Sequence, residues 1–297
     1  MSESLFTTHK YVIPFKKFNE PIYLIPFGDI HRHAPLCHIR RWKEFLEWAK
    51  TKKRAYFLGM GDYDDMASGS ERKILYGNYL HESSSKTIEN LQRGHVNELC
   101  KEIEFMKGRI IGFLEGNHYG QFPNGTTTTQ LMCEKLDAKY LGYSSFVRLC
   151  FRHSQENSKK SASLDIWAFH GKGSSSGRYV GGSVNSVQGM NEIADADIFL
   201  SGHDHKKWVA MKTKLTLTDS HGYLTLKHRK VLLGRTGSFL KGYEPGEESY
   251  VAASGMTPTD LGVIKIELTP KREEHEMPPS SLIKRQDRIH IDIHASI

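Results

Sequence analysis

Short apolar runs that end in a polar loop recur along the first half of the chain. Residues 22–29, 55–62 and 109–118 each carry such a run, which is typical of a buried strand followed by its exit loop. Between them, residues 37–53 and 86–107 place apolar side chains at helical spacing, which predicts two amphipathic helices. Strands that alternate with helices in this way predict an α/β fold.

Strand patterns dominate the second half of the chain. Residues 164–171 and 196–205 repeat the apolar run with a polar exit. Residues 214–218 and 223–234 alternate apolar and polar side chains and predict a hairpin. The sequence therefore predicts sheets covered by helices, with a mostly β second half. The polar stretch 69–85 predicts an irregular segment.

The composition is that of a globular protein with a mildly basic charge. The chain has 297 residues, of which 38% are hydrophobic, and a formal net charge of +7. This length suits one large domain. We expect a main domain over residues 21–270, an N-terminal extension over 1–20 and a C-terminal tail over 271–297. Residues 288–294 in the tail alternate strictly, so both an edge strand and disorder stay open.

Cysteine usage and the lack of any long apolar run indicate the cellular compartment of the protein. The four cysteines are scattered without a CxxC motif, which argues against a disulfide scaffold or a structural zinc site. The first residues lack the basic start and apolar core of a signal peptide. No apolar run approaches the ~18 residues of a membrane span. We therefore expect a cytoplasmic protein without membrane contact, and the sequence specifies no oligomeric state.

Each of five strand-like runs leads into a potential ligand. The blocks are GDIH at 28–31, GDYDD at 61–65, GNH at 116–118, HG at 170–171 and GHDH at 202–205. The carboxyl ends of strands are where α/β folds collect functional groups. Carboxylate, imidazole and amide donors together suit manganese, iron, zinc, cobalt or nickel. The five blocks therefore predict a metal site at one edge of the sheets.

In this order, the five blocks resemble the signature of the calcineurin-like metallophosphoesterase superfamily, and the chain is most similar in kind to its small bacterial and phage-type members. The resemblance spans residues 22 to about 206. It implies two central mixed β-sheets flanked by helices, and two divalent ions, with manganese expected and iron, zinc, cobalt or nickel as alternatives. The implied metal ligands are Asp29, His31 and His205 for the first ion, Asn117, His170 and His203 for the second, and Asp62 as the bridge.

The same resemblance implies a catalytic mechanism. A hydroxide that bridges the two metals attacks phosphorus, and His118 protonates or stabilises the leaving oxygen. Asp65 orients His118, with Asp64 as a local rival for that role. Asp204, between the two ligands of the last block, is expected to point away and to be structural.

Two positions depart from the phosphoprotein phosphatase branch of the family. Met66 and Tyr119 stand where that branch has Arg and Glu, which argues against a protein phosphatase. The sequence favours hydrolysis of phosphodiester bonds in a nucleotide or nucleic acid. The alternatives are a phosphomonoesterase acting on a small molecule and, less expected because every ligand is present, a non-catalytic scaffold.

Three basic residues near the blocks are candidates for binding a phosphoester substrate. Lys172 and Arg178 lie in a Gly/Ser-rich segment that directly follows a ligand, and Lys206 follows the last ligand. Arg178 offers a fork that matches phosphate. His33 lies two residues after His31, and we expect a solvated histidine there rather than a substrate contact.

Overall fold

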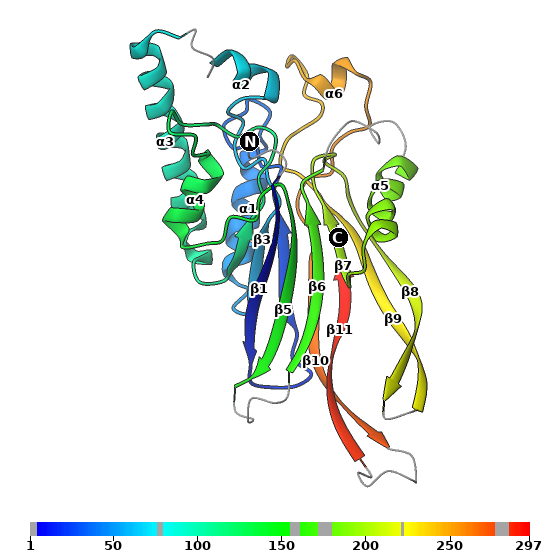
Figure 1. The fold of residues 1–297 in the computed structure, drawn as a ribbon. Coiled ribbons are helices and arrows are strands. Elements are labelled where there is room, and N and C mark those ends of the chain that lie inside the picture. Colours follow the sequence, from blue (N-terminus) through cyan, green and yellow to red (C-terminus); the bar gives the residue numbers. More distant parts are fainter. Residues whose placement is uncertain (1–4, 76–79, 155–160, 172–179, 221–222, 277–284) are drawn as a thin grey trace.

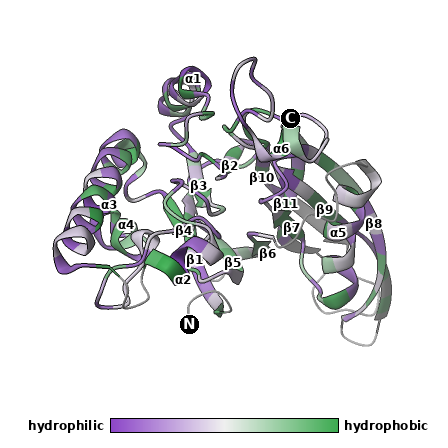
Figure 2. Ribbon diagram, turned by 90° about the horizontal axis from the view of Figure 1, so that it is seen from above, coloured by the Kyte–Doolittle hydropathy of each residue, from purple (hydrophilic) through white to green (hydrophobic). Residues whose placement is uncertain are grey.

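The computed structural model has two β-sheets packed face to face, with helices on their outer faces (Figure 1). Figure 2, viewed from above, separates α1, α3 and α4 on one side of the sheets from α5 on the other. The predicted fold class, two mixed sheets flanked by helices, is confirmed. The described residues are 5–75, 80–154, 161–171, 180–220, 223–276 and 285–297.

The six-stranded sheet draws on both halves of the chain. Its order is β1 (Phe6–Phe15), β5 (Ser144–His153), β6 (Ser161–Phe169), β7 (Ile198–Ser201), β9 (Tyr223–Thr236) and β8 (Lys207–Ser220). Strands β8 and β9 form the predicted antiparallel hairpin. Strands β6 and β7 run parallel, so their polar exit loops leave the sheet at the same end.

The five-stranded sheet carries the alternating strands and helices of the first half. Its order is β11 (Arg285–Ser296), β10 (Lys265–Glu276), β2 (Ile22–Phe27), β3 (Ala55–Gly59) and β4 (Ile110–Phe113). Strands β2, β3 and β4 are parallel to one another. Parallel strands need crossover connections, and helices supply them here. As a result, the three exit loops that follow these strands lie at one end of the sheet.

The helices occur in the connections between strands. They are α1 (Ile39–Lys50), α2 (Gly69–Leu75), α3 (Glu82–Ile103), the short 3₁₀ helix η2 (Glu104–Met106), α4 (Thr128–Leu136), α5 (Val180–Ile193) and α6 (Tyr250–Ala253). The expectation of an irregular segment over residues 69–85 is wrong for α2 and for the first turn of α3. In α2, Arg72 points inward and is buried, a packing that the polar composition alone does not indicate.

Three apolar clusters hold these layers together. One lies between the sheets and joins residues such as Leu24, Leu149 and Ile266. A second joins the five-stranded sheet to α1, α3 and α4 around Trp42 and Phe57. A smaller one packs α5 onto the six-stranded sheet. The sheets are therefore rigid supports on which the exit loops are held.

Both ends of the chain add strands to the sheets. Within the predicted N-terminal extension, β1 pairs in parallel with β5 and buries Ile13 and Phe15. Within the predicted tail, β11 pairs with β10 and buries Ile293, which favours the edge-strand alternative. Among the described helices, none is both long and apolar enough to cross a membrane.

Candidate metal centre

The predicted ligands converge at one end of the two sheets, beside α2 and α6 (Figure 1). They come from the exit loops of β2, β3, β4, β6 and β7. These loops are joined by backbone hydrogen bonds, because the amide of Asp29 donates to Gly61 and the amide of Gly202 donates to His170. The parallel pairing of the strands therefore brings together residues that are far apart in the sequence.

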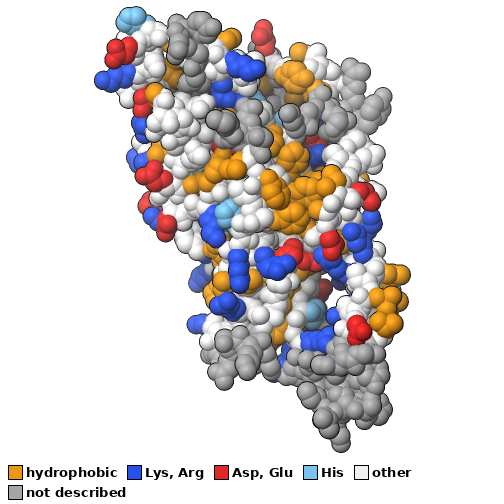
Figure 3. Space-filling model, in the orientation of Figure 1, with side chains coloured by type: hydrophobic (Ala, Val, Ile, Leu, Met, Phe, Trp, Pro, Cys, Tyr) orange, Lys and Arg blue, Asp and Glu red, His pale blue; other side chains and the backbone are white. Residues whose placement is uncertain are grey.

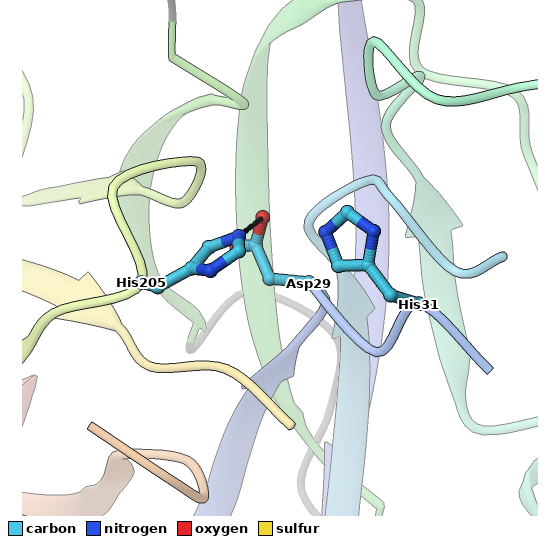
Figure 4. Close-up of side chains that lie close together, drawn as sticks. All are labelled: Asp29, His31 and His205. Carbon is cyan, nitrogen blue, oxygen red and sulfur yellow. Dashed lines mark ion pairs between the residues drawn. The ribbon is translucent and has the colours of Figure 1, made fainter. Parts of the chain in front are cut away.

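The first group of donors consists of Asp29, His31 and His205. Their ligand atoms all lie within 4.8 Å of one another. His205 Nε2 is 3.4 Å from Asp29 Oδ1, and His31, on the same loop as Asp29, lies beside this pair (Figure 4). All three side chains are directed toward a common point, as a set of metal ligands requires.

The second group consists of Asp62, His170 and His203, whose ligand atoms also lie within 4.8 Å of one another. Asn117 joins it, since its Oδ1 lies 2.9 Å from His170 Nε2 and 2.9 Å from His203 Nδ1. Asp62 Oδ2 lies 3.2 Å from His170 Nε2 and 3.9 Å from His31 Nε2. Asp62 therefore lies between the two groups, the position that a bridging carboxylate would take.

Each buried carboxylate is held in place by hydrogen bonds to one of its oxygens. Its other oxygen faces the predicted metal ligands. Asp62 Oδ1 accepts backbone hydrogen bonds from Asn117 at 2.7 Å and His118 at 2.9 Å. Asp29 Oδ2 accepts one from the amide of His203 at 2.9 Å. Likewise, His170 Nδ1 donates to the carbonyl of Met60 at 2.7 Å, which leaves Nε2 as the ligand atom.

The backbone of the site is held in an unusual conformation. Seven of the described non-glycine residues have positive φ, and five of these are predicted ligands. They are Asp29 at 46°, His31 at 47°, Asp62 at 49°, His203 at 71° and His205 at 54°. Such conformations cost about 1–3 kcal/mol each and persist where the surroundings impose them, commonly at functional sites. The backbone strain is therefore typical of loops that form a functional site.

The glycines of the motifs make room for the ligands. A Cβ on Gly116 would clash with Asp62 Oδ1, and one on Gly202 would lie 2.7 Å from Asp29 Oδ2. A Cβ on Gly61 would lie 2.5 Å from His170 Nδ1, and Gly61 also has a φ of 99°. The loops can pack this closely only because these positions lack side chains.

The carboxylates and imidazoles shift one another's pKa. Burial raises the pKa of Asp29 and Asp62, but the neighbouring histidines outweigh it and the net pKa of each is lowered. Burial lowers the pKa of His170, but Asp62 outweighs it and raises the pKa to about 9. Burial, followed by the charge of His170, lowers the pKa of His203 to about 4. The centre thus holds negative carboxylates that attract positive charge.

Several buried donor atoms at this centre lack a hydrogen bond. Within the described part of the chain, Asp29 Oδ1 and both ring nitrogens of His31 have no hydrogen-bond partner. An unsatisfied buried polar atom costs about 1–3 kcal/mol. A divalent cation would satisfy Asp29 Oδ1 and one ring nitrogen of His31, and donors of carboxylate, imidazole and amide type suit manganese, iron or zinc. The residues present therefore fit a metal ion.

His118 and Asp65 form a pair beside the two groups. His118 Nδ1 is 2.5 Å from Asp65 Oδ1, and the His118 ring is 4.9 Å from that of His31. Burial lowers the pKa of His118, but Asp65 and Asp62 outweigh it and the net pKa is raised. Because Asp65 engages Nδ1, Nε2 is the nitrogen that can face a substrate. Asp65, rather than its rival Asp64, makes this contact.

Two other polar residues of the blocks have contacts of their own. Asp204 accepts from Ser183 Oγ at 2.5 Å and pairs with Arg235 Nε at 3.2 Å, in keeping with the structural role expected for it. The expectation that His33 is a solvated histidine is wrong. His33 Nδ1 is 2.9 Å from Asp64 Oδ1, and the His33 ring is stacked on another histidine.

A cavity of about 620 Å³ opens over the centre. Five of the seven predicted ligands line it, and the segment around α6 forms a wall that includes Tyr250, Val251 and Met256. The five are His31, Asp62, Asn117, His203 and His205. Lys206 also lines the cavity, but its ammonium donates to the carbonyls of Thr257 and Pro258. This basic side chain therefore ties down the wall. Lys172 and Arg178 lie outside the described residues.

Arg72 supports the loop that carries Asn117, although the sequence pattern did not single it out as a site residue. Its Nη1 donates to the carbonyls of Ala67 and Asn117, both at 2.6 Å, and its guanidinium lies 3.8 Å from the centre of the Tyr119 ring. Arg72 is only 6% exposed. Tyr119, a departure from the phosphoprotein phosphatases, is thus part of this support. No spacing rule links an arginine in a polar stretch to a loop that far along the chain.

No model of a known protein family and no curated protein matches the chain. Among solved structures, a double mutant of Vps29 from Entamoeba histolytica is 11% identical, with a TM-score of 0.35 over 93% of this chain and 100% of that one. GAP50, the anchor in the inner membrane complex of Plasmodium, is 12% identical, with a TM-score of 0.39 over 84% and 81%. Wild-type Vps29 complexed with zinc reaches a TM-score of 0.26 at 12% identity, over 92% and 99%. Likenesses this distant carry no functional argument.

Proposed function

We propose that the chain is a metal-dependent phosphoesterase of the calcineurin-like metallophosphoesterase superfamily that hydrolyses phosphodiester bonds of nucleotides. One observation carries this proposal: seven donors in two adjoining groups meet at one end of the sheets, with Asp62 between the groups and the His118–Asp65 pair at their side. Two groups joined by a carboxylate match a centre that binds two divalent ions.

Each group would hold one ion. Asp29, His31 and His205 would bind the first, and His170, His203 and Asn117 the second, with Asp62 shared. Manganese is the expected metal, since oxygen and nitrogen donors without thiolate suit it. Bound ions would supply Lewis acidity toward the phosphate oxygens and lower the pKa of water.

The side chains around the donors would position the substrate and move a proton. His118 Nε2 would donate a proton to the leaving oxygen, and the raised pKa of the ring favours the protonated form that this step needs. Asp65 would hold the ring through Nδ1 at 2.5 Å. Because Asp62 Oδ1 is fixed by the amides of Asn117 and His118, the donors and the acid share one rigid frame.

The cavity favours a substrate of nucleotide size. Its volume of about 620 Å³ suits a small molecule, and Val251, Met256 and the Tyr250 ring offer an apolar wall for a base. On the face that Figure 3 shows, basic and acidic side chains are interspersed and do not form one basic tract. A cyclic nucleotide or a dinucleotide therefore fits better than a nucleic acid polymer, although all three contain phosphodiester bonds.

A substrate panel tests this function. The purified chain, loaded with manganese, zinc, cobalt or nickel, would be assayed on cyclic nucleotides, dinucleotides, single-stranded DNA, a nucleotide monoester and a phosphopeptide. We expect the highest kcat/KM on a nucleotide diester, and a kcat about 10²–10⁴-fold lower in the matched variant His118→Asn. Faster turnover of the monoester would favour the phosphomonoesterase alternative. No turnover of any substrate by metal-loaded protein would favour a scaffold.

A further inference from the structure

A second set of histidine and carboxylate side chains lies beside the candidate centre. His33 follows β2, Asp64 follows β3, and His95 lies within α3. Their ligand atoms lie within 4.8 Å of one another, and none of the three belongs to the donor groups described above. We call these three residues the α3 cluster. It joins two exit loops of the five-stranded sheet to the helix that covers them.

The α3 cluster uses a carboxylate that turns away from the candidate centre. Asp64 Oδ1 accepts from His33 Nδ1 at 2.9 Å and from the amide of Asp65 at 2.9 Å. Asp64 Oδ2 lies 3.2 Å from His95 Nδ1. Asp64 therefore spans the two imidazoles, while the next residue, Asp65, contacts His118.

Two potential ligand atoms of the α3 cluster are buried without a hydrogen bond. Asp64 is only 8% exposed, and its Oδ2 has no hydrogen-bond partner among the described residues. The same holds for His95 Nδ1. The 3.2 Å between these two atoms is an ion-pair distance that lacks hydrogen-bond geometry. Two buried, unsatisfied donor atoms that face each other form a place for a cation.

The two imidazoles are stacked beside Asp64, and one ring would turn for both to bind the same ion. The His33 and His95 rings are stacked, with centroids 3.5 Å apart and planes inclined by 17°, and each directs Nδ1 toward Asp64. On the far side of His33, Glu98 Oε2 lies 3.2 Å from Nε2. A carboxylate on the second ring nitrogen fixes the tautomer of a ligating histidine and raises its basicity. Glu98, one helical turn after His95, fits that supporting role.

We propose that the α3 cluster is a separate zinc site, with His33 Nδ1, His95 Nδ1 and Asp64 Oδ2 as ligands and Glu98 as the supporting carboxylate. On binding, His33 Nδ1 would lose its proton and exchange its hydrogen bond to Asp64 Oδ1 for the ion. Two imidazoles and one carboxylate form a ligand set that zinc commonly accepts, with water at the fourth position. The bound zinc would fasten the loops after β2 and β3 to α3. It would be independent of the two ions that the proposed function requires.

Zinc stoichiometry tests this site. Each protein would be dialysed against chelator-buffered zinc, and bound zinc would be measured per folded chain. We expect His95→Ala to bind one zinc fewer than the wild type, while His294→Ala, a change to an exposed histidine of β11, binds as much as the wild type. Asp62→Asn, which damages the candidate centre, should still bind the zinc that His95→Ala loses.

Further outcomes decide between a zinc site and an ion-pair cluster. Equal zinc binding by His95→Ala and wild type would overturn the proposal, and so would a complete loss of zinc in Asp62→Asn. Equal losses in His95→Ala and His294→Ala would show surface binding only and would also overturn it. If His95→Ala does not fold, Glu98→Gln decides: zinc affinity should fall about 10–100-fold at this site. An unchanged affinity would contradict the supporting role and the site.

Discussion

The candidate metal centre and the α3 cluster share one loop but differ in backbone. Asp62 and Asp65 face the centre, whereas Asp64 between them faces the cluster. Among the described residues, five of the seven predicted ligands of the centre have positive φ. No member of the α3 cluster does. Both sets contain histidine and aspartate side chains, but only the candidate metal centre has a strained backbone.

The difference teaches what each set is built for. Strained residues persist where the fold imposes a geometry that the chain would otherwise avoid, and active sites are the usual place. At the centre, five strand ends and close-packed glycines impose it. The α3 cluster lies partly on a regular helix and needs no such conformation. The contrast supports the proposals of reaction chemistry at the centre and loop fastening at the cluster.

The largest expected effect comes from the carboxylate between the two donor groups. Asp62→Asn should lower kcat/KM by about 10³-fold or more, since metal ions contribute several kcal/mol of transition-state stabilisation. The amide keeps the Oδ1 acceptor for the two backbone amides but weakens both groups of donors. Activity on a nucleotide diester and bound manganese measure this change. Full metal occupancy with full activity would remove Asp62 from the centre.

The next largest effect is expected at His118, the proposed general acid. His118→Asn should leave metal binding intact and lower kcat by about 10²–10⁴-fold, the usual contribution of a general acid. Asp65→Asn should have the same effect, but smaller, because the ring then loses only the partner that orients it. Metal analysis alongside kcat separates the two roles. If His118→Asn loses its metals, the residue is a ligand and the assigned role is wrong.

The sequence predicted the fold, and it singled out side chains that the structure brings together, because their signals are local. Each ligand follows an apolar run directly, and the order of strands along the chain brings their ends together. Parallel pairing of β2, β3 and β4 then places the three loops side by side without further information. The glycines beside the predicted ligands are also a local signal, since each marks a place where a ligand side chain packs closely against the backbone.

The supporting contacts could not be predicted because they join distant segments. Arg72 reaches the carbonyl of Asn117 from a stretch that reads as irregular. His95 meets Asp64 only because α3 packs over the β3 loop, and nothing in the helix pattern singles out one histidine. The engagement of Lys206 with two carbonyls likewise depends on where the segment around α6 folds back.

Removing the metals should destabilise the two regions separately. A ligand at 100 times its Kd stabilises the folded state by about 2.7 kcal/mol for each site. Chelator should therefore lower the Tm of the wild type, and His95→Ala should retain the part of that shift due to the centre. Asp62→Asn should retain only the part due to the α3 cluster. Identical shifts in all three proteins would contradict two separate regions.

The smallest expected effect tests how the centre is held in place. Arg72→Met removes the donor to the Asn117 carbonyl but keeps an apolar stem against Tyr119. We expect metal affinity to fall about 10-fold, the lower end for a partner that supports a ligand rather than binding the ion. Arg93→Met is the matched control, because Arg93 also lies over an aromatic ring, that of Phe122, and its side chain donates to Glu89 rather than to a ligand loop. Manganese titration of both variants measures the difference, and kcat at saturating metal should stay close to that of the wild type. Equal affinities in the two variants would mean that the Asn117 loop keeps its geometry without Arg72.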